Sequence, residues 1–166
     1  RRKALGRISE MPHSFVDGRM PNQIIKQIPC LVDNKNRNSF TILHSLSHLL
    51  IRKLSIESGY SLSSIKERLY FDANEGIINY ASIILYTAGP SSDGTLGGLS
   101  GQANLRRMKK IVENALKSRR FCSNDPVCME HKSLDQEPNG AACHTCLMLP
   151  ENSCECRNHM LDRNWG

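Results

Sequence analysis

Cysteines are concentrated near the end of this chain. Six of the seven lie between Cys122 and Cys156, and only Cys30 stands apart. Cys143 and Cys146 have the Cys-x2-Cys spacing with which two thiolates on a tight turn reach one tetrahedral zinc ion. The pattern therefore predicts zinc. The alternatives are a disulfide framework, which needs an oxidising compartment, and inert thiols.

The zinc ligands are expected within this cluster. Four of five candidates are needed, in falling order of expectation Cys143, Cys146, Cys154, Cys128 and Cys122. Four cysteines make a closed structural site that leaves no position for water, so no hydrolysis is expected there. His131 or His144 is an alternative ligand, or lies beside the thiolates together with N–H donors. Residues 122–166 lack strong periodicity, so we expect the metal to replace a hydrophobic core there.

Two histidines, His44 and His48, lie one helical turn apart on one face of an apolar helix. Their spacing suits a metal ion, but Ser45 stands where the His-Glu-x-x-His motif has its glutamate. The apolar surroundings favour histidines buried in a core or an interface. The alternative is an enzyme, a metal-dependent nuclease or hydrolase that uses His44, His48 and Asp93 around a second metal ion.

A glycine-rich loop runs from Gly89 to Gly101, between a predicted strand and a predicted helix. The N-terminus of that helix is a natural anion site. However, the loop matches neither common nucleotide-binding motif, no lysine is placed for a phosphate, and Asp93 would repel one. A tight structural connection is the favoured interpretation, and we expect no ATP hydrolysis by this chain alone.

The elements that position these residues predict a mixed α+β fold, in which helices flank a small sheet and an irregular four-cysteine segment follows. We expect an irregular stretch to residue 38 with a polar turn at 33–38, helices over 39–58 and 62–70, strands over 77–80 and 83–87, and a helix ending at Arg120. Ser39 or Thr41 is the expected cap of the first helix, and Gly59 is its stop. Ser64 and Glu67 have capping-box spacing for the second helix. The strands are rich in β-branched residues.

The formal net charge of +6 is unevenly distributed. Residues 101–123 carry a net +6 and residues 124–166 a net −4, which favours a polyanion as partner. In the helix ending at Arg120, the apolar residues share one face: Leu105, Met108, Val112, Ala115 and Leu116. The cations outside that face are the candidate contacts to the DNA backbone: Arg106, Arg107, Lys109, Lys110 and Lys117. Such contacts do not read sequence.

Composition excludes some classes of protein. Apolar residues make up 39% and charged residues 23%, which argues against wholesale disorder. No apolar run approaches the roughly 20 residues of a membrane span, so no membrane partner is expected. No signal peptide is visible and the chain lacks an initiator methionine. We expect a piece of a longer polypeptide.

Several segments carry a resemblance to a known family. They are Thr41–Arg52, Ile84–Ala88, Ser92–Leu99, Cys122–Cys128, Ala141–Leu147, Pro150–Cys154, Asn158 and Leu161–Arg163. Together they resemble the helicase-associated domain of unknown function shared by DrmB of the DISARM phage-defence system and the C-terminal zinc-binding region of MrfA-type superfamily-two DNA-repair helicases. We call the Cys143-x2-Cys146 turn the knuckle. The Cys-x5-Cys of Cys122 and Cys128, which precedes the knuckle, is closest to the DrmB-like branch, and Cys156 has no counterpart in the family pattern.

The resemblance implies a bacterial, cytoplasmic accessory module without catalysis of its own and without a small-molecule substrate. Such a module is expected to bind Zn²⁺ and to help a helicase engage DNA, or to assemble with helicase motor domains in cis or with a partner helicase subunit. The expected layout is an N-terminal lead-in (1–38), the helicase-associated α/β domain (39–121) and a cysteine-rich zinc-binding segment packed on it (122–163). A pure protein-interaction scaffold is a further alternative.

Overall fold

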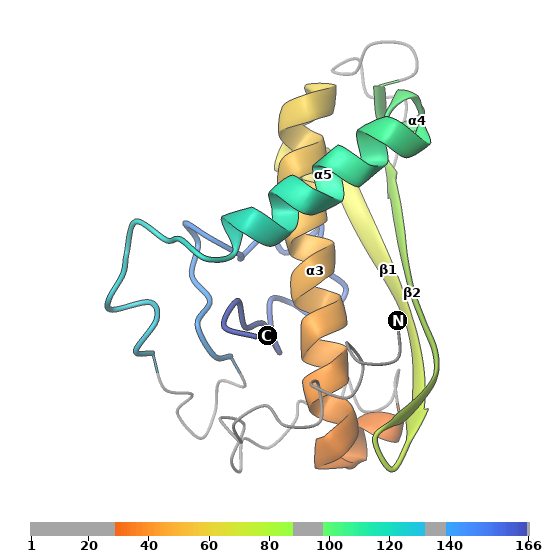
Figure 1. Ribbon diagram of the computed structural model, residues 1–166, viewed down its shortest axis with the longest axis vertical. Coiled ribbons are helices and arrows are strands. Elements are labelled where there is room, and N and C mark those ends of the chain that lie inside the picture. The colour runs from red at the N-terminus through yellow and green to blue at the C-terminus, as the bar shows by residue number, and fades with distance from the viewer. Residues whose placement is uncertain (1–28, 88–97, 132–138, 166) are drawn as a thin grey trace.

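The computed structural model describes residues 29–87, 98–131 and 139–165 (Figure 1). Its elements are η2 (Pro29–Val32), α3 (Asn34–Ser58), η3 (Leu62–Ser64), β1 (Ile65–Asn74), β2 (Ile77–Thr87), α4 (Gly98–Gly101) and α5 (Leu105–Ser118). Helices and one antiparallel two-stranded sheet confirm the mixed fold class, and turns carry the cysteine-rich segment. Within the described ranges, no helix is both long and apolar enough to cross a bilayer.

Helix α3 is the longest element. It precedes the sheet and α5 in sequence and lies at the centre of the view in Figure 1. Its predicted end is confirmed, because Gly59 takes φ 74° and caps the last turn. Its predicted start is wrong. The helix begins at Asn34 rather than near Ser39, because the Asp33 carboxylate accepts the N–H of Lys35 at 2.9 Å and caps the first turn.

Strand β1 stands where the sequence predicts a second helix. Only Leu62–Ser64 is helical, and the strand follows directly. Alternate residues of β1 are buried: Ile65, Glu67, Leu69, Phe71 and Ala73. This period of two is typical of a strand with one face packed. The capping-box spacing of Ser64 and Glu67 wrongly predicts a helix, because Glu67 faces the interior and contacts α3 instead of capping a helix.

The sheet has one packed face and one open face. β2 runs antiparallel to β1, and it is one continuous strand where the sequence predicts two short ones. Phe71 of β1 packs edge-on against Phe40 of α3, with ring centroids 5.6 Å apart. The outer face exposes large side chains of both strands: Tyr70, Tyr80, Ile84 and Tyr86. The side of the sheet away from α3 therefore offers large aromatic and apolar side chains, interspersed with the charged residues Lys66, Arg68 and Asp72.

Helix α5 crosses α3 (Figure 1) and confirms the predicted helix. Ile111 and Ala115 are buried and Met108 is half-buried. Leu105, expected on the apolar face, is instead 83% exposed. Leu105 lies in the first turn of α5, at the margin of the buried face that is centred on Ile111 and Ala115. Ile111 therefore points inward, and Leu105 does not.

The cysteine-rich segment contributes to the core although its described residues, 122–131 and 139–165, form no helix or strand. Leu147 packs with Leu49 of α3 and Ala115 of α5, and Leu149 packs with Ile51 of α3. The expectation that metal replaces a hydrophobic core here is therefore wrong. Apolar burial and the cysteine cluster act on the same segment.

Candidate metal centres

Four sulfurs converge between the loop after α5 and the segment that follows residue 139. The Sγ atoms of Cys122, Cys128, Cys143 and Cys146 all lie within 4.8 Å of one another. Three separations are 3.5 Å (Cys122–Cys143), 3.7 Å (Cys128–Cys146) and 3.6 Å (Cys143–Cys146). Metal–sulfur bonds of about 2.3 Å give a tetrahedron with edges of about 3.7 Å, which these distances match. A disulfide bond is far shorter, about 2.05 Å. The arrangement fits one zinc ion and not a disulfide framework.

The knuckle is a tight turn that points N–H groups at sulfur. The Cys143 carbonyl accepts the N–H of Cys146 at 3.2 Å and that of Leu147 at 3.0 Å. The N–H of Cys143 donates to Cys146 Sγ at 3.3 Å, and the N–H of Asn124 donates to Cys122 Sγ at 3.4 Å. Such donors stabilise thiolate charge around a metal ion.

Thiol ionisation in this group is uneven. Burial raises the pKa of Cys143, but hydrogen bonds from the backbone of Cys146 and Thr145 and from the Cys122 thiol outweigh it and bring the pKa to about 6. Burial raises the pKa of Cys146 well above its usual value, and the neighbouring Cys128 adds to this. The Cys143 thiolate therefore forms readily near neutral pH, whereas Cys128 and Cys146, whose pKa values are raised, require a cation beside them.

A buried arginine lies behind the four sulfurs. Arg163 is only 1% exposed, and its guanidinium donates to the Asp125 carboxylate and to the Arg119 carbonyl. Burial lowers the pKa of Arg163, but the adjacent Cys128 and Asp125 outweigh it and raise the pKa. This cation offsets part of the negative charge that four thiolates leave around a divalent ion. The sequence includes Arg163 in the family resemblance but assigns it no role.

Helix α3 holds the knuckle from its other side. The Arg52 guanidinium donates to the carbonyl oxygens of Thr145 at 2.6 Å and Met148 at 3.1 Å. One turn earlier, His48 Nδ1 lies 3.0 Å from the Leu147 carbonyl oxygen. The apolar helix thus positions the metal-binding turn through two polar side chains.

The four grouped cysteines are among the five candidates, and the fifth candidate, Cys154, lies apart from them. The sequence ranks Cys154 above Cys122 as a zinc ligand. In the structure, the Cys122 thiol is the one that lies with Cys128, Cys143 and Cys146. The turns after Pro150 bring the Cys154 thiol to α3, 3.2 Å from His44 Nε2. The spacing of the cysteines in the sequence does not indicate that the turns after Pro150 bring Cys154 to α3. Among the described residues, neither His131 nor His144 belongs to a group of side chains that could hold a metal ion.

The second group consists of His44, His48, Glu67 and Cys154, whose donor atoms also lie within 4.8 Å of one another. Glu67 Oε1 is 3.1 Å from His44 Nε2 and 3.5 Å from His48 Nε2. Both histidines are 0% exposed, which confirms them as core residues. Asp93, the third residue of the alternative enzyme site, lies outside the described residues, as does most of the glycine-rich loop. Sequence reasoning assigns Glu67 to a capping box and misses its place in this group. The available signal is an acidic residue at an inward position of a strand.

Opposite charges in this second group stabilise one another's ionised forms. Burial lowers the pKa of His44, but the Glu67 carboxylate outweighs it and raises that pKa well above its ordinary value. Burial raises the pKa of Cys154, and His44 lowers it to a net value of about 7. Burial alone dominates at Cys156 and raises its pKa to about 12. Two adjacent buried thiols therefore differ sharply in their readiness to ionise.

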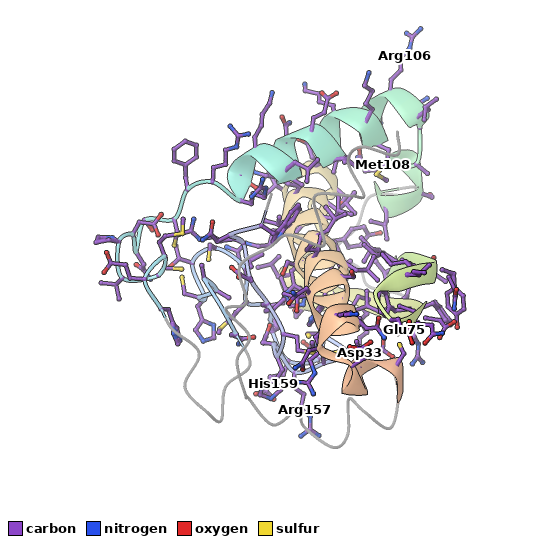
Figure 2. All side chains as sticks on the ribbon, turned by 60° about the horizontal axis from the view of Figure 1, so that its bottom comes forward. Asp33, Glu75, Arg106, Met108, Arg157 and His159 are labelled. Carbon is purple, nitrogen blue, oxygen red and sulfur yellow. The ribbon has the colours of Figure 1, made fainter. Side chains whose placement is uncertain are left out.

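The basic residues of α5 form a separate exposed surface. All five candidate DNA contacts are exposed: Arg106, Arg107, Lys109, Lys110 and Lys117. Figure 2 shows Arg106 extending away from the rest of the chain at the start of α5, while Met108 lies on the inner side. We call these five residues the basic face of α5.

Comparison with known proteins places the four-sulfur group in a family. A family model described as the MrfA Zn-binding domain matches residues 46–147, which hold α5 and all four grouped cysteines. The DISARM protein DrmB of Bacillus paralicheniformis (strain ATCC 9945a / NCIMB 11709 / CD-2) is 41% identical over 126 residues, which cover 75% of this chain and 22% of that protein. The chain thus spans about a fifth of the length of that relative. With the family match over more than half of its residues, the chain belongs to the MrfA Zn-binding domain family, and its four-cysteine group is positioned to bind zinc.

Proposed function

We propose that this chain is a zinc-stabilised, non-catalytic module of a bacterial helicase or DISARM system, and that it engages DNA in the cytoplasm through the basic face of α5. The observation that carries the proposal is the orientation of this helix. Ile111 and Met108 pack on α3, and the cations of the helix are all exposed. Likeness to the DISARM protein DrmB and to the MrfA Zn-binding domain supports the cellular context.

Zinc has a defined part in this proposal. The loop that carries Cys122 and Cys128 follows directly after α5. An ion bound there would fix the end of the basic helix relative to the knuckle, which α3 holds through Arg52. Four sulfur ligands fill a tetrahedral ion and leave no open position for water, which supports a structural role.

DNA binding by the basic face should depend steeply on salt. Each phosphate neutralised by a lysine or arginine releases counterions, and no base is read. Reversing Lys109 and Lys110 to glutamate should weaken binding to duplex DNA. It should also flatten the log–log salt dependence by about two if each lysine contacts one phosphate. Fluorescence anisotropy over a series of salt concentrations measures both quantities.

A matched control reverses two cations elsewhere, Lys35 at the start of α3 and Arg157 in the C-terminal segment. This variant has the same net charge as the first but should keep most of the salt slope. Equal losses in both variants would mean that only net charge matters. Unchanged affinity and slope in Lys109→Glu/Lys110→Glu would remove DNA from the proposal.

Assembly with a protein is the second candidate function, and the outer face of the sheet favours it. Tyr80 and Ile84 are 57% and 48% exposed there, and Tyr70 and Tyr86 lie on the same open face. Helicase motor domains, in cis or on a partner helicase subunit, are the proposed occupants. A chain that binds zinc but shows no salt-dependent affinity for DNA would favour this scaffold role.

A further inference from the structure

We propose that His44, His48, Glu67 and Cys154 form a second, interior metal site for a zinc-like divalent transition-metal ion. The four donors come from three separate parts of the fold. α3 supplies both histidines, β1 supplies Glu67, and the C-terminal segment supplies Cys154. The family match over residues 46–147 leaves out His44 and Cys154, so it does not imply this site.

The distances suit a small tetrahedral ion. His44 Nε2 is 3.1 Å from Glu67 Oε1 and 3.2 Å from Cys154 Sγ, and His48 Nε2 is 3.5 Å from the same carboxylate oxygen. Zinc bonds of about 2.0–2.3 Å to nitrogen, oxygen and sulfur place ligand atoms about 3.3–3.7 Å apart. The remaining pairs of donor atoms lie within 4.8 Å of one another, so all four can approach one ion.

The ring of His48 is oriented as a ligand. Its Nδ1 must donate to the Leu147 carbonyl, since that oxygen can only accept, at 3.0 Å. In a neutral ring, Nε2 then carries a lone pair that faces Glu67 and Cys154. This atom is fully buried and has no hydrogen-bond partner. A carboxylate and a thiolate offer no proton to it, so a metal ion is the partner that suits all three groups.

The anionic donors are themselves held in place. The Ser47 hydroxyl donates to Glu67 Oε2, and the N–H of Glu155 donates to Oε1 at 3.2 Å. The N–H of Asn158 donates to Cys154 Sγ at 3.1 Å. Hydrogen bonds of this kind orient ligands around a metal ion and are a regular part of metal sites.

Charge balance also favours a divalent ion. One carboxylate, one thiolate and two neutral imidazoles together carry two negative charges, which a divalent cation cancels. The mixed nitrogen, sulfur and oxygen donor set is typical of zinc and related borderline metals. Four protein ligands in a solvent-free interior make a structural site that ties α3, β1 and the C-terminal segment together. Without metal, the same four side chains would have to form a buried network of protonated imidazoles and anions.

Metal content of the whole chain tests the site directly. Elemental analysis of the wild-type chain from zinc-supplemented medium should find about two zinc ions per chain, one for each group of four ligands. Cys154→Ser should retain about one. Cys156→Ser is the matched control, because Cys156 is also a buried thiol, two residues away, and lies outside the group. It should retain both ions.

The coordination shell of the wild-type chain provides a second test that needs no variant. X-ray absorption at the zinc edge should show imidazole scattering and oxygen or nitrogen ligands beside sulfur. A shell of sulfur alone would overturn the second site, and so would about one zinc per wild-type chain or an unchanged zinc content in folded Cys154→Ser. These readouts do not involve DNA, so they are independent of the proposed function.

Discussion

Replacing Cys143 and Cys146 by serine together should abolish zinc binding at the four-sulfur group and unfold the turns that carry it. Structural zinc contributes about 10–16 kcal/mol of apparent binding free energy in zinc-finger peptides, and this is also folding free energy. Residues 139–165 contain no helix or strand, so without the ion their turns depend on packing against α3 and α5 and on side-chain hydrogen bonds such as those of Arg52. We therefore expect amide exchange in this segment to become fast in the variant.

The effect should spread beyond the knuckle because its neighbours belong to the core. Leu147 and Leu149 pack on α3, so their release uncovers apolar surface of α3 and α5. Thermal unfolding followed by circular dichroism should show a lower and broader transition, with much of the helical signal retained at low temperature. Cys30→Ser is the control, since Cys30 lies far from the four sulfurs in sequence and is absent from both metal-like groups. Wild-type zinc content in the double variant would contradict the assignment.

Local signals in the sequence predict the helices better than β1. The Gly59 stop and the apolar periodicity of α5 are both strong, and both elements are confirmed. β1 was missed because Glu67 interrupts the alternation of apolar residues and mimics a capping box. Contacts with His44, the Ser47 hydroxyl and the N–H of Glu155, all distant in sequence, explain a buried acid at this position. Long-range pairing of this kind overrides local propensity.

The two candidate metal centres likewise have some features that local sequence predicts and others that depend on the fold. The density of cysteines and the Cys-x2-Cys spacing are local, and they predict a zinc site in the correct segment. The choice between Cys122 and Cys154 depends on how two loops fold back on α3, and spacing does not contain that information. The pair His44 and His48 is visible in the sequence, but its partners on β1 and in the C-terminal segment are not. A metal site assembled from three elements becomes apparent only in the fold.

Arg163→Ala should be strongly destabilising. The side chain is fully buried and paired with Asp125, whose side chain is 31% exposed. Removing one partner of such a pair leaves a carboxylate without its cation, and truncation of a large buried side chain leaves a cavity. We expect the free energy of unfolding to fall by about 2–5 kcal/mol, mostly from the cavity, because water screens the partly exposed Asp125 carboxylate. Urea denaturation of the zinc-loaded chain measures this change.

Zinc affinity should fall in the same variant, because Arg163 also positions one corner of the four-sulfur group. Asp125, held by Arg163, accepts the N–H of Cys122 through its other carboxylate oxygen at 3.1 Å. Competition with a chromophoric chelator should therefore remove zinc from Arg163→Ala at lower chelator concentration than from the wild type. Arg163→Lys keeps the charge without the planar fork and should lie between the two. Arg120→Ala, an exposed arginine near the same loop, should change stability by no more than about 0.5 kcal/mol. Equal chelator sensitivity in Arg163→Ala and Arg120→Ala would show that the buried cation does not support the metal centre.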